Sequence, residues 1–511
     1  MSTRRHRLAA FAAGALGVLA AACSAATLDG RAAAVDDLFP GANYGENAAP
    51  SGDEFGATQG GLQGLTFARE LVAAGRVPPA EAFVAEAMFS EHDLPVDGEA
   101  CDEPLCLRAT SGVAPNNDGA LAGWIQVGLS SSIDPATFVR PSITLVVAVD
   151  VSGSMGWSYQ SPSTEYPTPG GVARALLRAI TAELGASDRF ALVTFDDVTT
   201  QALPLIAGSN DLSIQGAIDA LTDGGSTNLE AGLTAAFDLA RTGLDGTTDE
   251  VRVVLLSDAQ PNVGATTPSA FQTLVRAAAS DGVSLTVFGL GVGLDAALLG
   301  EIVTVRGGNA YTLSDYDDVT ALMADAWPYF VSPVAYDLHL ALTPPATMSI
   351  AATYGFPDDG TASVGFDVAT VFLSRRRGAL LIELAPSTTP IAAFAATGTL
   401  SYTAPDGSTH EQVLAPSYDG SALDASGRYF AQLGVGKTVA LALLVEGMAT
   451  AAHEYSASHT EAVATLTAAL DRFVSDVTAL GTSDLQIEVT FAQQLLSLMQ
   501  SGAPQGDLYG R

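Results

Sequence analysis

Two kinds of hydrophobic pattern divide the chain. Between residues 141 and 331, continuous apolar runs such as ITLVVAV (143–149) alternate with segments whose apolar residues recur at helical spacing, such as GGVARALLRAITAELGA (170–186). Continuous apolar runs are typical of parallel strands that are buried on both faces. Strands that alternate with helices indicate an α/β fold. The pattern therefore predicts a doubly wound, mostly parallel, Rossmann-like sheet over residues 141–331.

After residue 332 the pattern changes to a two-residue alternation, as in AYDLHLAL and GALLIELA. This alternation predicts a β-rich, β-sandwich-like domain over residues 332–455. We interpret TVALALLVEG (438–447) as one of its strands. Residues 456–511 have helical spacing and predict C-terminal helices, and residues 63–140 predict an N-terminal region of helices plus a strand.

The first residues have the composition of an export signal. MSTRRHR is cationic, and LAAFAAGALGVLAAA is apolar but too short and too weakly apolar to span a bilayer as a stable helix. We therefore predict a signal peptide over residues 1–22. The string LAAAC resembles a bacterial lipoprotein cleavage box, so we expect a lipid on Cys23. An ordinary cleaved signal and a retained anchor are the alternatives.

Residues 23–62 are rich in Ala, Gly, Asn and Asp, which predicts a flexible tether. Ser24 beside the lipidated cysteine favours sorting to the outer membrane in a cell with two membranes. We therefore expect an exported protein of the cell envelope, held by its lipid on the periplasmic or surface side of that membrane.

The chain has three cysteines. A lipid on Cys23 would leave Cys101 and Cys106 free to form a local disulfide in an oxidising compartment. Zinc is the alternative for this pair, but no second pair of soft ligands lies nearby in the sequence. We predict the disulfide.

Charge excludes two classes of partner. Only 15% of the residues are charged, and the formal net charge is −34. Such an acidic chain is unsuited to bind nucleic acid or an anionic membrane surface. Contact with a membrane is therefore expected through the lipid anchor alone.

Oxygen-bearing side chains follow two apolar strands of the predicted sheet and occupy one glycine-rich loop. Asp150, Ser152 and Ser154 follow the first strand, Asp258 ends VRVVLLSD, and Thr227 lies in DGGSTNLEAGL. Binding crevices of open α/β sheets lie outside the carboxyl ends of the strands. An oxygen-only set without His or Cys suits Mg²⁺, with Mn²⁺ or Ca²⁺ as alternatives. Because several ligands are neutral hydroxyls, such an ion would accept one more anionic oxygen, for example a carboxylate of another protein.

The motifs DVSGSM, GGSTN and LLSDAQPN together resemble the metal-ion-dependent adhesion site of von Willebrand factor type A (VWA) domains. The resemblance implies that the five residues named above are the metal positions, with Asp258 acting through water. NYGENAAP and ELVAAGRVPPAEAFVAEAMF extend the resemblance to a bacterial lipoprotein branch that carries a calcium-activated chloride-channel-like label. Two features depart from that branch: the stretch over residues 156–170 is longer, and ATYGFPDD replaces a Tyr-Glu-Asn-Arg motif.

These observations favour a non-enzymatic envelope lipoprotein whose Mg²⁺ bridges to an acidic residue of a protein ligand. Catalysis would need a general base near the metal, and no His lies close in sequence to the ligand loops. The alternatives are a structural scaffold with a silent metal site and an accessory component of an envelope hydrolase or transport complex. The string LGVGKT is not a phosphate loop, since Ala431 stands where the motif needs Gly.

Overall fold

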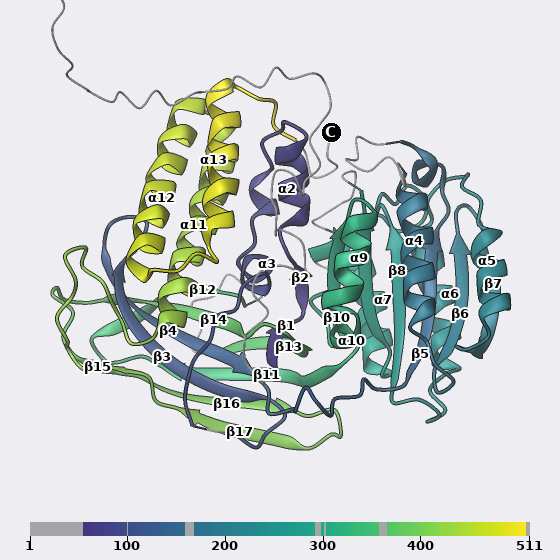
Figure 1. The fold of residues 1–511 in the computed structure, drawn as a ribbon, viewed down its shortest axis with the longest axis horizontal. Helices are drawn as coiled ribbons and strands as arrows, with labels where there is room; N and C mark the ends of the chain where they lie inside the picture. The colour runs from purple at the N-terminus through teal and green to yellow at the C-terminus, as the bar shows by residue number, and fades with distance from the viewer. Residues whose placement is uncertain are drawn as a thin grey trace, which may run out of the picture. The chain divides into compact units, whose positions relative to one another are not determined.

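The strands of the predicted α/β unit, joined at one edge by the short strand β2, form a seven-stranded sheet in the order β2-β10-β9-β8-β5-β6-β7 (Figure 1). The computed structural model describes residues 55–99, 101–158, 168–291, 298–300, 303–356 and 365–506. All neighbouring strands of this sheet are parallel except the edge pair β6–β7. The strands are β2 (Gly61–Gln63), β5 (Ile143–Asp150), β6 (Arg189–Phe195), β7 (Thr199–Ala207), β8 (Glu250–Ser257), β9 (Ser284–Leu290) and β10 (Gly308–Leu313).

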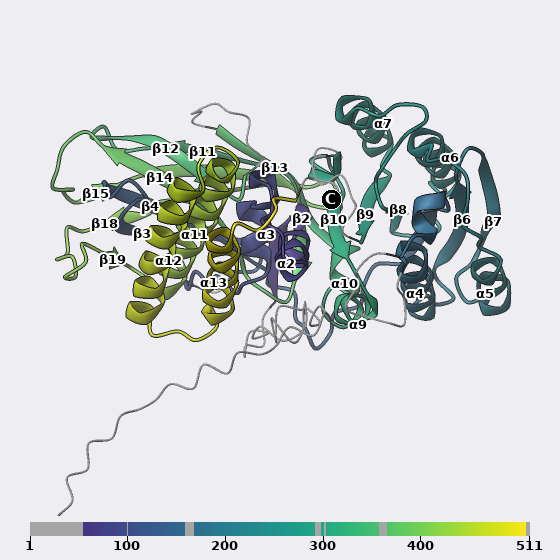
Figure 2. The same ribbon diagram turned by 90° about the horizontal axis from the view of Figure 1, so that it is seen from above.

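Helices cover both faces of the sheet, which confirms the predicted doubly wound α/β class (Figure 2). Side chains of the central strand β5 alternate between two cores: Leu145 and Val147 face one set of helices, while Val146 and Ala148 face the other. The first set is α4 (Pro169–Ala182), α5 (Asp211–Asp219), α9 (Tyr316–Asp325) and α10 (Trp327–Phe330); the second is α6 (Leu229–Arg241) and α7 (Pro268–Ser280).

The β-rich part is an antiparallel sheet with the path β12-β14-β4-β1-β13-β11-β16-β17, to which β3 and β19 are added beside β4. Its strands are β1 (Gly56–Gln59), β3 (Cys106–Pro115), β4 (Leu121–Ser130), β11 (Pro333–Thr343), β12 (Met348–Tyr354), β13 (Gly365–Ser374), β14 (Gly378–Pro386), β16 (Thr397–Thr403), β17 (Thr409–Leu414) and β19 (Tyr429–Phe430). A separate pair is formed by β15 (Phe394–Ala395) and β18 (Ser417–Tyr418).

This sheet curls over its own apolar core, as expected of a sandwich-like domain. Strands β17 and β3 are far apart in the pairing order, yet the Leu107 amide donates to Oε1 of Gln412 over 3.3 Å. The amide nitrogen of Gln412 in turn donates to the Leu105 carbonyl over 3.2 Å. The two ends of the sheet therefore meet through side chains.

The N-terminal region does not form a unit of its own. Strands β1, β3 and β4 belong to the antiparallel sheet, and the α/β unit is inserted between β4 and β11. The predicted separation of residues 63–140 from 332–455 therefore does not describe the fold. The predicted tether over 23–62 also extends too far, because β1 lies within it and β2 begins within it. Both strands are short and rich in Gly and Gln, so they lack the apolar run that marks a strand in sequence.

The interpretation of residues 438–447 as a strand is wrong. They belong to the helix α11 (Leu433–Tyr455), so the C-terminal helices begin at residue 433 rather than 456. A helix that is apolar on all sides is a buried helix, and periodicity alone cannot distinguish it from a buried strand. Within the described part of the chain, α11 is also the one helix long and apolar enough to cross a bilayer. However, 83% of its apolar 18-residue stretch is buried inside the protein.

The remaining helices pack on α11 or on one another. They are α2 (Thr66–Ala73), the 3₁₀ turn η1 (Ala80–Ala82), α3 (Ala85–Ser90), α12 (His459–Leu480) and α13 (Gln486–Ser501). The glycines of LGVGKT serve this packing: a Cβ on Gly434 would lie 1.7 Å from the Pro95 carbonyl oxygen, and one on Gly436 would lie 2.5 Å from Leu480. Close helix packing explains the phosphate-loop-like string.

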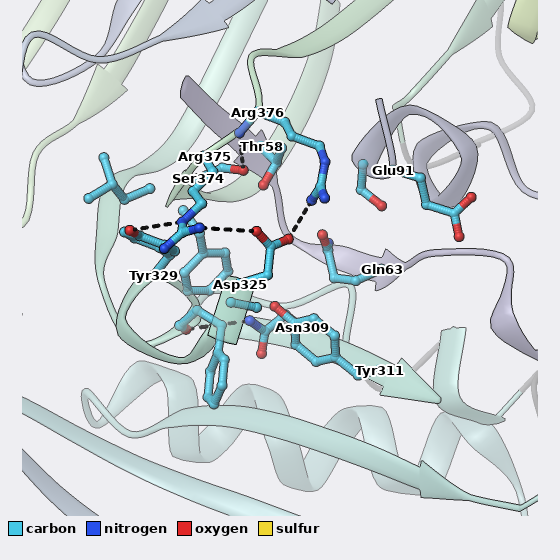
Figure 3. A pocket seen from close by; sticks show the side chains of 15 residues that line it. Thr58, Gln63, Glu91, Asn309, Tyr311, Asp325, Tyr329, Ser374, Arg375 and Arg376 are labelled. Carbon is cyan, nitrogen blue, oxygen red and sulfur yellow. Dashed lines mark hydrogen bonds and ion pairs between the residues drawn. The ribbon is translucent and has the colours of Figure 1, made fainter. Parts of the chain in front are cut away.

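A turn between β13 and β14 joins the antiparallel sheet to the α/β unit (Figure 3). Arg376 donates to Oδ2 of Asp325, the last residue of α9, over 2.7 Å, and both side chains are almost fully buried. Arg375 lies 3.9 Å from the other oxygen of Asp325 and donates to the Tyr329 hydroxyl over 3.4 Å. The pocket in Figure 3 is thus lined by ion pairs that hold the two parts together.

Cys101 and Cys106 are joined by a disulfide at the start of β3. Cys23 and the predicted signal peptide lie outside the described residues, and so do residues 159–167 of the long stretch before α4.

Candidate metal centre

The first ligand loop begins where the central strand β5 ends. Asp150 is the last residue of β5 and is 1% exposed, and the Ser152 amide donates to its Oδ1 over 2.8 Å. The chain then enters a short 3₁₀ turn, η2 (Gly153–Gly156), which returns Ser154 toward Ser152. The hydroxyl oxygens of Ser152 and Ser154 lie 3.2 Å apart. The turn thereby gathers three oxygen-bearing side chains at one strand end.

The second loop follows β8, the neighbour of β5. Asp258 comes directly after this strand and is 3% exposed. Burial raises the pKa of its carboxyl, and hydrogen bonding by the Ser154 side chain and the Gln260 backbone opposes this rise. Oδ1 of Asp258 is buried and has no hydrogen-bond partner among the described residues. A buried carboxylate oxygen without a partner is unfavourable unless a cation or water satisfies it.

The third loop carries Thr227, which is 1% exposed. The Gly153 amide donates to the carbonyl of Gly225 over 3.0 Å, which ties this loop to the first one. Gly225 has φ +84°, and a Cβ there would lie 3.0 Å from Asp196, so the loop needs glycine at this position. Asn262 ties the third loop to the second one. Its side-chain Oδ1 accepts from the Thr227 backbone amide over 2.9 Å, and its backbone amide donates to the Thr227 carbonyl over 3.1 Å.

The structure therefore brings all five predicted residues together at the carboxyl end of the parallel strands. Asp150, Ser152 and Ser154 share one loop, and Thr227 and Asp258 reach the same place from two others. That these residues hold a metal stays a prediction, which the chemistry of the donors can test.

Electrostatics favour a cation between the two carboxylates. Burial, reinforced by the charge of Asp258, raises the pKa of Asp150 to about 7. Burial also raises the pKa of Asp258, against hydrogen bonds that lower it. Like charges at one buried place disfavour ionisation unless a counter-charge is present. The residues fit a hard divalent ion, because every donor is an oxygen and Oδ1 of Asp258 still lacks a partner.

The sequence model of the von Willebrand factor type A domain matches residues 144–325, which cover β5 through α9 and all three ligand loops. Residues 144–325 form a von Willebrand factor type A domain. The rest of the chain, with its antiparallel sheet and C-terminal helices, lies outside this match.

Two curated relatives match this chain over part of their length. The uncharacterized protein YfbK of Escherichia coli (strain K12) is 27% identical over 281 residues, which are 53% of this chain and 46% of that protein. Inter-alpha-trypsin inhibitor heavy chain H4 of Homo sapiens is 28% identical over 204 residues, which are 37% of this chain and 20% of that protein. The chain thus spans less than half the length of either relative.

Solved structures with a similar fold include a von Willebrand factor type A protein from Catenulispora acidiphila. It is 15% identical, with a TM-score of 0.47 over 74% of this chain and 89% of that one. Another is proximal thread matrix protein 1 of the mussel byssus with a zinc-occupied MIDAS motif. It is 20% identical, with a TM-score of 0.30 over 36% of this chain and 47% of that one.

Sequence reasoning missed two residues that position the ligands of the type A domain. Ser257 donates to Oδ2 of Asp150 over 2.6 Å, and Asn262 holds both backbone groups of Thr227. The sequence contains a signal for Ser257, since this polar residue directly follows the apolar run Val253–Leu256 at the end of β8. Asn262 gave none, because loop asparagines are common in turns.

A second group with metal-ligating side chains lies outside the type A domain. Glu91, His92 and Glu488 each place one ligand atom within 4.8 Å of the others. The guanidinium of Arg69 already lies 2.7 Å from both Glu91 and Glu488. This arginine supplies the positive charge, so the group is a buried ion-pair network rather than a second metal centre.

Proposed function

We propose that this chain is a non-enzymatic protein of the cell envelope that binds a protein partner through a divalent cation in its type A domain. The residues proposed to hold the cation are Asp150, Ser152, Ser154, Thr227 and Asp258. The observation that carries the proposal is the meeting of two buried carboxylates, one with an unpartnered oxygen, on three loops joined by hydrogen bonds. Type A domains as a class commonly hold a divalent metal and mediate protein interactions.

The donor set explains why a partner would be needed. Ser152, Ser154 and Thr227 offer neutral hydroxyls, and by resemblance Asp258 acts through water, so Asp150 is the one carboxylate in direct contact. A bound Mg²⁺ would supply a positive charge that its own site neutralises incompletely. An acidic side chain of another protein completes such a site, which makes the type A domain a receptor for a carboxylate.

The proposal leaves out catalysis because no histidine lies on the described ligand loops. The histidines of the described part of the chain lie outside residues 144–325: His92 contacts Glu488, and the others are His339 on β11, His410 on β17, His453 on α11 and His459 on α12. We therefore assign the domain a binding role. The envelope location rests on the sequence: the predicted signal over 1–22, a lipid on Cys23, and a disulfide of the kind found in oxidising compartments.

Magnesium binding to the full chain tests the metal site directly. We expect calorimetric titration of Mg²⁺ to give binding heat with the wild type and none with Asp150→Asn, which keeps the shape of the side chain but removes its charge. Asp134→Asn, at an exposed position, is the matched control and should bind like the wild type. No binding heat in the wild type would mean a silent site and a scaffold role.

Partner capture tests the bridge. Bait protein in Mg²⁺ should retain a partner from cell extracts, and EDTA or Asp150→Asn should release it, while circular dichroism reports an unchanged fold. Retention that survives both treatments would exclude a metal bridge, even if the site binds Mg²⁺.

A further inference from the structure

Three exposed apolar side chains lie on loops next to the metal ligands. Trp157 is 69% exposed, Val198 is 67% exposed and Val263 is 39% exposed. Single exposed apolar residues are normal on a protein surface, so their number means little. Their positions relative to the ligand loops are what matters.

Trp157 and Val263 are each one hydrogen bond away from a predicted ligand residue. The Trp157 amide donates to the Ser154 carbonyl over 3.0 Å, at the end of η2. The Val263 amide donates to the Thr227 carbonyl over 3.1 Å. Both residues are therefore tied through their backbones to the loops that carry the predicted ligands.

Val198 is held by the turn between β6 and β7. Its amide donates to Oδ1 of Asp196 over 2.7 Å, and its carbonyl accepts from the Asp196 amide over 3.2 Å. The Asp196 carbonyl accepts from Asn228, the residue after Thr227, over 3.1 Å. A chain of hydrogen bonds thus fixes Val198 relative to the third ligand loop.

A hollow of about 370 Å³ is lined by Val198 together with residues of β7 and of α5 and the segment after it. Strand β7 and helix α5 lie at one edge of the sheet (Figure 2). One of its lining residues is Val151, which stands between Asp150 and Ser152 in the chain. The apolar part of the lining is formed by Val151, Val198, Ala202, Ala217, Ala220 and Leu221. The hollow therefore begins at the first ligand loop itself.

The charges nearby restrict what can enter. Asp196 lines the hollow, and Asp197 lies next to it in the chain, with its Oδ1 accepting from the Ser226 amide over 3.0 Å. Asp223 is paired with Arg174, so that arginine adds no free positive charge. A second carboxylate of the partner would be repelled here, whereas an apolar side chain would cover apolar surface.

We propose that the partner carries a bulky apolar side chain within a few residues of its metal-seeking acidic residue, and that this side chain fills the hollow beside Val198. The inference rests on the proposed function and adds the sequence context of the acid that the domain selects. Val198 and Val151 contact the apolar side chain, and the acidic residue reaches the cation.

Peptide selection on the full chain tests this inference. The probe is a phage-displayed library of short peptides with random residues around one fixed glutamate, selected in Mg²⁺ and, in parallel, in EDTA. We expect Mg²⁺-dependent enrichment of peptides with Phe, Leu, Ile or Trp near the glutamate, and a depletion of further acids. Enrichment of the glutamate with no apolar preference would overturn the inference and leave the metal bridge standing. No Mg²⁺-dependent enrichment at all would reject both.

Substitutions in the hollow test whether the preference for an apolar peptide residue arises there. For a synthetic peptide of the enriched sequence, Val198→Ser and the hollow-filling Ala217→Phe should each raise the Kd about tenfold or more, as for a central apolar contact. Val413→Ser, at a 73% exposed valine on β17, is the matched control and should leave the Kd unchanged. All three should bind Mg²⁺ like the wild type by calorimetry. A Kd unchanged by both hollow variants would overturn the inference.

Discussion

The hydroxyl of Ser257 donates a hydrogen bond of 2.6 Å to Oδ2 of Asp150. The bond joins the last residues of the neighbouring parallel strands β8 and β5, and both side chains are buried. The Ser257 oxygen also accepts from the Ala259 amide over 2.9 Å, which directs the hydroxyl proton toward Asp150. With the Ser152 amide on Oδ1, each oxygen of the Asp150 carboxylate has a fixed donor.

Ser257→Ala should weaken Mg²⁺ binding without unfolding the domain. Loss of the hydroxyl leaves Asp150 free to turn, and removal of a residue that orients a metal ligand costs about 10–100-fold in affinity. Calorimetric titration measures the change. Ser280→Ala, at an exposed serine of α7, should bind like the wild type. Equal affinities of Ser257→Ala and wild type would show that Ser257 does not position the ligand.

The junction between the type A domain and the antiparallel sheet offers two ion pairs for comparison. Arg376 and Asp325 form a buried pair at 2.7 Å, while Arg306 and Asp337 form an exposed pair at the same distance. Water screens the exposed pair, so its distance alone says little about its strength.

Double-mutant cycles should separate the two pairs. We expect Arg376→Met with Asp325→Asn to give a coupling energy of about 1.5 kcal/mol or more, and the same cycle on Arg306 and Asp337 to give about 0.5 kcal/mol or less. Urea unfolding of each variant supplies the free energies. Equal coupling energies in the two cycles would mean that burial does not strengthen the ion pair between Arg376 and Asp325.

Much of the type A domain could be predicted from sequence because its strands are buried on both faces. A run such as residues 143–149 has few other structural meanings when helical segments flank it. Four of the five candidate ligands followed from the same fact, since the carboxyl ends of parallel strands meet at one edge of the sheet. Thr227 lies in a glycine-rich loop and was assigned by the resemblance of its motif. The order of the strands in the sheet comes from the structure alone.

The remainder depended on contacts between distant parts of the chain. Strands β1 and β2 are stabilised by pairing with β13 and β10, and nothing in their own residues signals this. Helix α11 is apolar on all sides because protein surrounds it, so its sequence resembles a buried strand. The roles of Ser257 and Asn262 appear only when two loops are placed side by side.

A buried ion-pair network ties the N-terminal helix α2 to the C-terminal helix α13. Arg69 donates to Oε1 of Glu488 over 2.7 Å, and the His92 ring lies 3.1 Å from the same oxygen. Burial alone would raise the pKa of Glu488, but Arg69 and His92 outweigh it and hold the pKa at about 2, against an ordinary value of 4.5. A lowered pKa means that the ionised carboxylate stabilises the folded state above the unfolded pKa and that this contribution is lost as the pH falls toward 2.

Glu488→Gln should therefore destabilise the protein at neutral pH and matter much less in acid. We expect a loss of about 3 kcal/mol in the free energy of unfolding at pH 7, because Arg69 loses a buried counter-charge. At pH 3 the difference in free energy of unfolding between wild type and variant should be about half of this or less. Urea unfolding at the two pH values measures both. Glu411→Gln, at an exposed position on β17, should change the free energy little at either pH. If the difference in free energy of unfolding between wild type and Glu488→Gln stays constant from pH 7 to pH 3, Glu488 contributes by packing rather than by its charge.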